Sequence, residues 1–172
     1  MSLKHKIIFD TINYLGIDPD IFFETGTGEA ETLRAMQASV YFEWHFSCEV
    51  DLHQYLKSLE VMMYCPNATV VYGPSKEVMP RLLPHLQNRK IVFWLDAHFN
   101  EGHELFESGC PTMDELGNIA AHHPEGNLIF IDDAHLFGVD PAYPTPEDIG
   151  RWVRYHGYGI ERVEDIYCIA KD

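Results

Sequence analysis

The chain has little positive charge, and this shortage excludes two classes of partner. Lysine and arginine together number 12, against 27 aspartates and glutamates, for a formal net charge of −15. Such an excess of acid repels phosphate backbones and anionic membrane surfaces. We therefore expect neither a nucleic-acid nor a membrane partner. The acidity is compatible with a divalent metal, with a cationic cofactor or with solubility alone.

Cysteine pairs and long apolar runs are also missing. The four cysteines form no CxxC motif, and Cys48 and Cys168 fall in apolar, strand-like segments, as reduced core thiols of a cytosolic protein do. No stretch reaches the roughly 18 consecutive apolar residues of a membrane span. Residues 1–20 show no apolar core followed by a cleavage site. The sequence predicts a soluble, cytoplasmic protein.

The length and composition fit one domain with a real core. The chain has 172 residues, of which 46% are hydrophobic and 23% charged, and this size is typical of a single domain. Apolar residues at helical spacing predict an amphipathic helix over residues 4–16. We expect a single domain over residues 1–172, with the helix in residues 1–20 and the core in residues 21–172.

Strand and helix patterns alternate along the core. The predicted strands are 21–24, 45–50, 68–72, 91–95 and 128–131, followed by a hairpin of 160–163 and 166–169. The predicted helices are 29–38, 51–63, one starting at 75, 111–121 and 147–156. Helix 51–63 carries four apolar residues along one side: Leu52, Leu56, Leu59 and Met63. The pattern predicts an α/β, doubly wound, mostly parallel sheet with a C-terminal antiparallel hairpin and helices on both faces.

A glycine-bearing turn lies between the first strand and its helix. It reads Glu24-Thr25-Gly26-Thr27-Gly28, and Glu49 ends the next strand, near the ~20-residue offset at which an acid binds ribose hydroxyls. Glycines let the backbone approach a ligand at a helix N-terminus. The context predicts a nucleoside site, and the alternative is a tight turn with Glu49 as a solvated acid.

Aspartates follow two of the most apolar strands. Asp96 comes after 91–95, and Asp132 and Asp133 come after 128–131. Because the carboxyl ends of neighbouring parallel strands border one crevice, these three side chains could converge on a cation or a polar substrate. Alternatively, one aspartate caps a helix and the others are solvated.

Six motifs occur in an order shared with a known family. Between Glu24 and about Leu136 the chain contains, in turn, ETGTG, CEVD, YGPSKEVMP, FWLDAH, CPTMDEL and IFIDDAH. This series resembles the class I S-adenosylmethionine-dependent methyltransferases, and in particular a bacterial group with FWLDxH at one strand end and a later LIDDA segment. The resemblance implies a Rossmann-like, seven-stranded sheet whose last strand is antiparallel.

The resemblance also implies a cofactor site. Its members are Glu24, Thr25, Gly26, Gly28, Glu49, Ser75 and Asp96. Among them, Glu24 and the two glycines would line the methionine end of S-adenosylmethionine. Glu49 would bind the ribose, and Ser75 would lie near the adenine.

The chain is similar as well to metal-dependent O-methyltransferases of the catechol and macrolide-sugar types. In those enzymes one aspartate after the fourth strand and an acidic pair after the fifth hold magnesium, a layout that Asp96, Asp132 and Asp133 match. Magnesium takes hard oxygen ligands and lowers the pKa of a bound hydroxyl. An alkoxide or phenolate would then attack the methyl group of the cofactor, which makes a small molecule with an oxygen acceptor the expected substrate.

The chain departs from these families at several positions. Ala30 and Glu31 stand where a third glycine is usual, and Pro74 replaces an acid that reads the adenine amino group. The catechol-type enzymes carry a lysine base just after the first aspartate, whereas this chain has His98. We expect His98, together with Asp96, to serve catalysis, His98 as general base or extra metal ligand.

Three alternatives follow from the same residues. The departures favour a degenerate cofactor-binding module without turnover. The segments 96–98 and 133–135, each reading Asp-Ala-His, could instead build a zinc or manganese site of a metallohydrolase. An NAD-type oxidoreductase is disfavoured because the turn lacks GxGxxG. A small domain without a substrate cap could also close its pocket as a homodimer.

Overall fold

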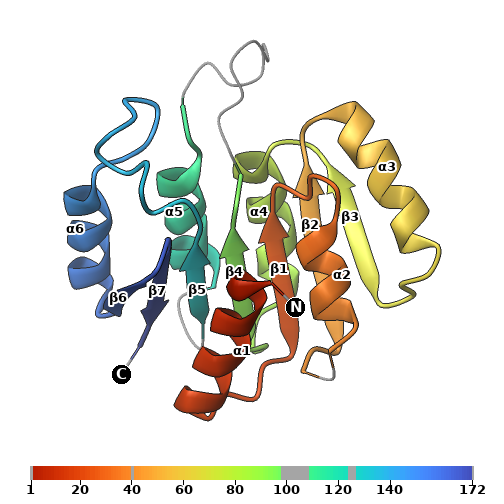
Figure 1. Cartoon of the computed structure of the whole chain (residues 1–172), viewed down its shortest axis with the longest axis horizontal. Helices are drawn as coiled ribbons and strands as arrows, with labels where there is room; N and C mark the ends of the chain where they lie inside the picture. Colours follow the sequence, from red (N-terminus) through yellow and green to blue (C-terminus); the bar gives the residue numbers. More distant parts are fainter. Residues whose placement is uncertain (1, 40, 98–108, 124–126, 172) are drawn as a thin grey trace.

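A seven-stranded sheet organises the molecule, with the strand order β3-β2-β1-β4-β5-β7-β6. The computed structural model describes residues 2–39, 41–97, 109–123 and 127–171 (Figure 1). The first five strands in this order run parallel, and β7 pairs antiparallel with both β5 and β6. The predicted Rossmann-like sheet with its C-terminal antiparallel hairpin is confirmed.

The strands lie within a residue or so of their predicted positions. They are β1 (Ile21–Thr25), β2 (Trp44–Glu49), β3 (Ala68–Tyr72), β4 (Ile91–Leu95), β5 (Leu128–Ile131), β6 (Gly159–Val163) and β7 (Ile166–Ala170). Every residue of β1, β4 and β5 is buried, as expected of central parallel strands covered on both faces. Acidic residues at the ends of these strands are therefore held on rigid elements.

In the described ranges, six α-helices and a short 3₁₀ helix precede or connect the strands. They are α1 (Leu3–Leu15), α2 (Glu31–Gln37), α3 (Leu52–Met62), α4 (Ser75–Leu82), η1 (Leu83–His85), α5 (Thr112–His122) and α6 (Pro146–His156). Two apolar clusters fill the two sides of the sheet. One joins the sheet to α4, α5 and α6, and the other joins it to α1, α2 and α3. Phe22 and Phe23 of β1 point to opposite clusters because neighbouring side chains alternate along a strand.

Local signals explain where several helices begin and end. Ser2 caps α1 and the left-handed Gly16 closes it, while Asp51 caps α3 by accepting the N–H of Gln54. The helix expected from residue 29 begins at Glu31, because Ala30 adopts a left-handed conformation with φ 60°. None of the helices in the described ranges is long and apolar enough to cross a membrane.

The apolar side of α3 faces outward. Leu52, Leu56, Leu59 and the adjoining Met63 are 38% to 74% exposed, whereas the buried residues of this helix are Ser58 and Val61. The Ser58 hydroxyl donates to the carbonyl of Tyr55, so its burial leaves no hydrogen bond unmade. The orientation of α3 is thus set by its place over β2 and β3, and the apolar pattern alone does not determine it.

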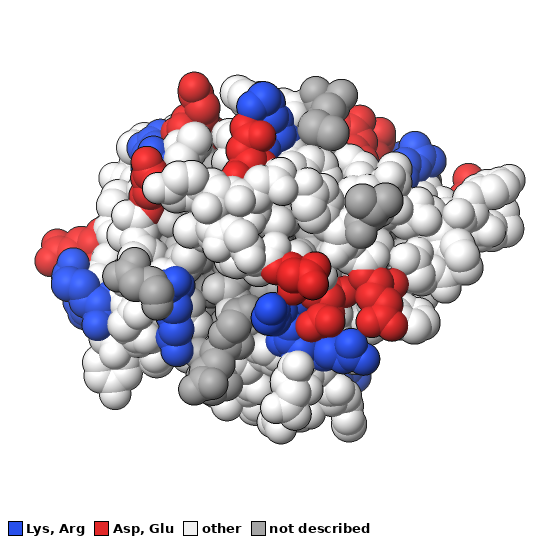
Figure 2. All heavy atoms as spheres, turned by 90° about the horizontal axis from the view of Figure 1, so that it is seen from below, with Lys and Arg blue, Asp and Glu red and all other residues white. Residues whose placement is uncertain are grey.

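Charges are mixed on the face seen from below in Figure 2. Lysines and arginines there adjoin aspartates and glutamates instead of gathering into a basic field. The absence of a nucleic-acid partner and the division of the chain into one domain both stay predictions.

Candidate functional site

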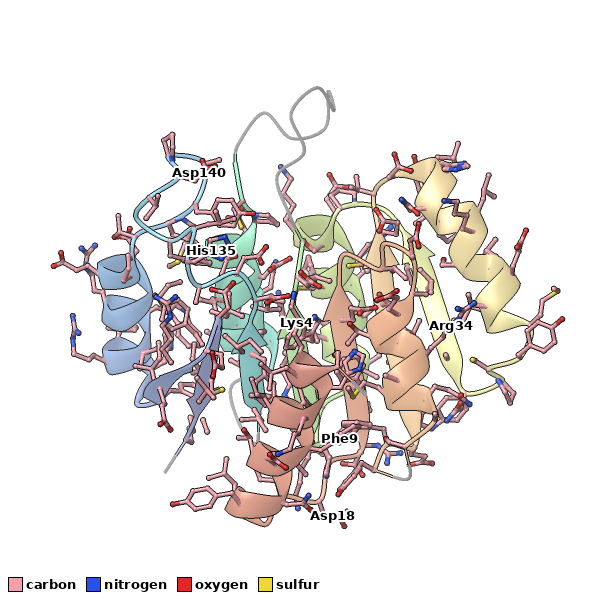
Figure 3. All side chains as sticks on the ribbon, in the orientation of Figure 1. Lys4, Phe9, Asp18, Arg34, His135 and Asp140 are labelled. Carbon is pink, nitrogen blue, oxygen red and sulfur yellow. The ribbon has the colours of Figure 1, made fainter. Side chains whose placement is uncertain are left out.

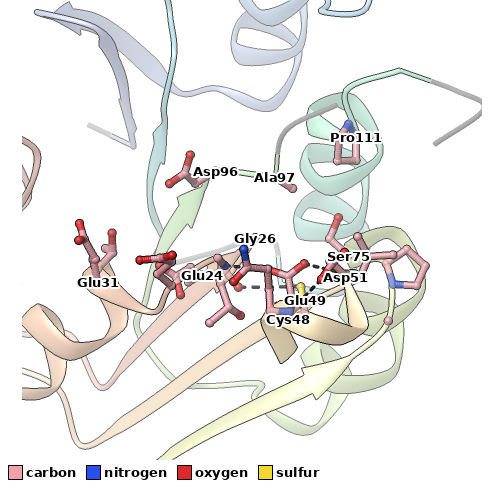
Figure 4. A pocket seen from close by; sticks show the side chains of 18 of the residues that line it. Glu24, Gly26, Glu31, Cys48, Glu49, Asp51, Ser75, Asp96, Ala97 and Pro111 are labelled. Atoms are coloured by element: carbon pink, nitrogen blue, oxygen red, sulfur yellow. Dashed lines mark hydrogen bonds between the residues drawn. The ribbon is translucent and has the colours of Figure 1, made fainter. Parts of the chain in front are cut away.

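A cavity of about 770 Å³ opens at the carboxyl ends of the parallel strands. Its wall includes Glu24 and the turn after β1, Glu49 from β2, Ser75 at the start of α4, and Asp96 after β4 (Figure 4). The first turn of α1 also contributes to the wall. This volume lies within the range of small-molecule and cofactor pockets.

The glycine turn is held tightly against the neighbouring strands. Gly26 has φ 76°, and a Cβ placed on it would lie 2.6 Å from the carbonyl oxygen of Asp96. Its N–H donates to the carbonyl of Cys48 at 3.0 Å. Ala30, which replaces the usual third glycine, is fully buried and adopts φ 60°. The turn therefore forms despite that replacement.

Glu49 joins the turn to the end of β2. Its carboxylate accepts the N–H of Gly28 at 2.8 Å and the N–H of Asp51 at 2.8 Å. Both bonds are partly buried, and as bonds to a carboxylate they are stronger than bonds between neutral groups. The remaining lone pairs of the carboxylate can accept hydroxyl groups from a ligand in the cavity.

Glu24 is a buried acid in the wall of the same cavity. The hydroxyl of Ser47 donates to its carboxylate at 2.7 Å and also bonds Thr27 at 2.6 Å. Burial raises the pKa of Glu24 well above its usual value; the Ser47 bond opposes the rise, and the negative charges of Asp96 and Glu49 add to it. A positively charged group placed in the cavity would stabilise the ionised form of Glu24.

Glu115 is a second buried acid near this site, and the sequence analysis missed it. It lies on α5 and is fully buried. Burial raises its pKa to about 7, while the hydroxyls of Ser75 and Thr25 oppose the rise. Its position could have been found, because Thr112, Glu115, Leu116 and Ile119 share one face at helical spacing and are all buried.

Lys4 is another residue that the sequence analysis missed, as it did the Ser47 hydroxyl that donates to Glu24. Its ammonium group forms an ion pair with Asp132, a residue 128 positions later. Burial lowers the pKa of Lys4, but the bond and charge of Asp132, with Asp96 and Asp133, raise it overall. Burial and the charge of Asp96 raise the pKa of Asp132 to about 6, and Lys4 opposes that rise. Periodicity places Lys4 on a helix but cannot show which strand end it reaches.

The three aspartates predicted to bind metal do not form one tight group. Asp133 has φ 53°, and its carboxylate lies near the imidazole of His135 and the carboxylate of Asp165. One ligand atom from each of the three side chains lies within 4.8 Å of the other two. In the part of the chain that the structure describes, no other three acidic, histidine or cysteine side chains meet this criterion. His135 Nδ1 and Asp165 Oδ2 are 2.6 Å apart. Metal binding by Asp96, Asp132 and Asp133 stays a prediction.

The predicted site residues have different outcomes. Six of them line the one cavity: Glu24, Gly26, Gly28, Glu49, Ser75 and Asp96. Thr25 is fully buried beside it, and its carbonyl accepts the N–H of Asp96 at 3.2 Å. His98, the predicted base, lies outside the described residues. Of the two histidines of the metallohydrolase alternative, the structure therefore places only His135, which lies with Asp133. The structure thus brings the expected cofactor set together.

Comparison with known proteins identifies the fold. No model of a protein family matches the chain, and no curated protein matches its sequence. Among solved structures, the SAH-bound methyltransferase PaMTH1 of Podospora anserina matches with a TM-score of 0.65 at 12% identity, over 100% of this chain and 80% of that one. A putative methyltransferase of Streptococcus mutans in complex with SAH matches with a TM-score of 0.64 at 10% identity, over 96% and 97%.

A third match is a putative caffeoyl-CoA O-methyltransferase from Staphylococcus aureus. Its TM-score is 0.64 at 11% identity, over 100% of this chain and 84% of that one. At such low identities the likeness establishes the fold alone. The chain has the Rossmann-like methyltransferase fold, and the predicted bacterial subgroup stays a prediction.

Proposed function

We propose that the chain is an S-adenosylmethionine-dependent methyltransferase that acts on an oxygen atom of a small molecule. One observation carries the proposal: in a methyltransferase fold, the glycine turn, Glu24 and Glu49 line one cavity at the carboxyl ends of the strands. Two of the matched structures were solved with SAH, the product form of this cofactor.

The chemistry of the wall suits this cofactor. Its methionine ammonium and sulfonium groups are cationic, and they would meet Glu24 and Asp96. The ribose hydroxyls would donate to Glu49, and the adenine would lie against the segment 73–75. When bound, S-adenosylmethionine supplies a methyl group whose bond to sulfur breaks, with the electron pair left on sulfur, as the acceptor oxygen bonds to the methyl carbon.

The acceptor would enter beside Asp96 and the first turn of α1. Lys4, Asp96 and Glu24 line the same cavity, and Asp96 is near enough to Glu24 to help raise its pKa. His98 is the proposed base that takes the acceptor proton. Magnesium assistance through Asp96, Asp132 and Asp133, and a homodimer that closes the pocket, both stay predictions.

Calorimetric titration tests the proposal. We expect S-adenosylmethionine and S-adenosylhomocysteine to bind the full chain at one site, and NAD not to bind. Glu49→Ala should weaken both interactions by tenfold or more, taking the loss of bonds to a charged group as about 1.5–3 kcal/mol. Glu60→Ala, which removes an exposed acid from α3, is the matched control. Failure of both cofactor forms to bind would refute the proposal.

A degenerate module is the second candidate. Pro74, at the start of α4, offers no side-chain acceptor for the adenine amino group, which favours weak binding. Such a module would bind the cofactor without consuming it. Mass spectrometry of S-adenosylhomocysteine formed with a panel of phenols and sugars distinguishes the two candidates.

A further inference from the structure

An ion pair joins the first turn of α1 to the end of β5. The ammonium of Lys4 contacts Asp132 Oδ2, and the two residues are 128 positions apart. The Asp132 side chain is 1% exposed, and the Lys4 side chain is 47% exposed. In Figure 3, Lys4 rises from α1 toward the strand ends. Asp132 is therefore the buried member of the pair, and because a buried carboxylate is costly without a partner, its charge requires a nearby cation.

Both oxygens of Asp132 are already bonded. Oδ2 is taken by Lys4, and Oδ1 accepts the N–H of Asp133 at 2.9 Å. The Asp133 side chain lies with His135 and Asp165 instead. The ammonium group of Lys4 thus occupies the place beside Asp132 that magnesium would take. Because the Asp133 side chain lies with other partners, the three acids do not form an open set of metal ligands.

Lys4 also lines the cavity that contains Glu24 and Asp96. An ammonium group has three N–H donors, so the bond to Asp132 leaves donors that can turn toward the cavity. We propose that Lys4 supplies the cation of the acceptor site in place of a divalent metal. This inference rests on the proposed function, since it deepens the account of how the acceptor oxygen is bound.

The consequence is that the first turn of α1 belongs to the acceptor site. An acceptor hydroxyl beside Asp96 would meet the ammonium of Lys4, which stabilises negative charge as it develops on oxygen. The helix is anchored for this role, because Ile7, Ile8 and Ile12 are buried in the core. Lys6, two residues later, instead forms an exposed pair with Asp10 on the same helix.

Manganese binding to the full chain tests the inference. Mn²⁺ is titrated into each chain with and without the additional substitution Asp132→Asn, by calorimetry and by electron paramagnetic resonance. Mn²⁺ binding that is lost when Asp132 is replaced by Asn is assigned to this site. We expect no such binding in the wild type or in Lys6→Met, the matched control. We expect it to appear in Lys4→Met, and to be absent from Lys4→Arg because the cation is kept.

Two results would overturn the inference. One is Mn²⁺ binding to the wild type that Asp132→Asn removes, a measurement that does not depend on the folding of the Lys4 variants. The other is the absence of Asp132-dependent binding from a folded Lys4→Met chain. S-adenosylhomocysteine is titrated on the same samples, so a failure of the proposed function is seen separately from a failure of the Lys4 inference.

Discussion

The carboxylate of Glu49 accepts the backbone N–H of Gly28 at 2.8 Å, so the end of β2 fixes the turn that follows β1. A second bond, from the N–H of Asp51 at 2.8 Å, fixes the start of α3 to the same carboxylate. One side chain therefore sets the relative positions of three segments that form the wall of the cavity.

The two hydrogen bonds that the Glu49 carboxylate accepts predict a graded effect of substitution on stability. Glu49→Ala removes both acceptors and should lower the free energy of unfolding by about 1–3 kcal/mol. Glu49→Gln keeps one acceptor oxygen and should lower it by clearly less. Urea denaturation measures both, with the exposed Glu60→Ala as control. Equal losses of unfolding free energy in the alanine and glutamine variants would contradict a stabilising role for these hydrogen bonds.

Gly26 should tolerate no side chain. A Cβ there would lie 2.6 Å from a backbone oxygen, at φ 76°, so Gly26→Ala combines a clash with left-handed strain. We expect a loss of about 1–3 kcal/mol beyond that of Gly157→Ala. Gly157 is the appropriate control because its φ is 71° and a Cβ there meets nothing within 4 Å. Similar unfolding midpoints for the two variants would show that the turn can move away from β4.

Stability should fall with rising pH through the titration of Glu115. Burial raises its folded pKa to about 7 from a reference value of 4.5, so the native state binds this proton more tightly than the unfolded state does. The resulting stabilisation is complete below the unfolded value and is lost as the pH rises through 7. The free energy of unfolding falls by up to about 3 kcal/mol over this range.

Glu115→Gln should remove this pH dependence. Urea denaturation at pH 5 and pH 8 would show a smaller difference for the variant than for the wild type. Glu60→Gln, which changes an exposed acid on α3, should leave the difference as it is. A wild type and a Glu115→Gln variant with parallel pH profiles would mean that Glu115 does not titrate in this range.

Lys4 and Lys6 should differ in their effect on stability although they lie on one helical turn. Lys4→Met leaves the buried Asp132 without its cation, and we expect a loss of about 2 kcal/mol, discounted because Lys4 is half exposed. Lys6→Met breaks an exposed pair, worth about 0.5 kcal/mol or less. Thermal unfolding at pH 8, where Asp132 is ionised, compares them. Equal shifts would indicate that the Asp132 pair contributes no more than a surface pair.

The sheet could be predicted because its signals are local. The apolar runs 91–95 and 128–131 are too uniform for half-exposed strands, and each is followed by a helix-forming segment. Parallel β/α units leave few permitted topologies, so the strand ends that carry Glu24, Glu49 and Asp96 necessarily share one edge.

Other features depend on contacts that no local pattern encodes. The pairing of Lys4 with Asp132 needs the packing angle of α1, and the turn of Asp133 away from Asp132 needs its left-handed φ of 53°. The outward side of α3 is a further case, because Leu56 follows the spacing of a buried face and yet is exposed. Tertiary packing overrides periodicity at these three places.

The position of α1 has a practical consequence for protein production. Because Ser2 and Leu3 form part of the cavity wall, residues attached ahead of them emerge beside the cavity mouth. The opposite end of the chain is remote from it, since Ala170 pairs with Leu128 at the start of β5. Purification tags and fusion partners are therefore better joined after β7, where they leave the cavity mouth unobstructed.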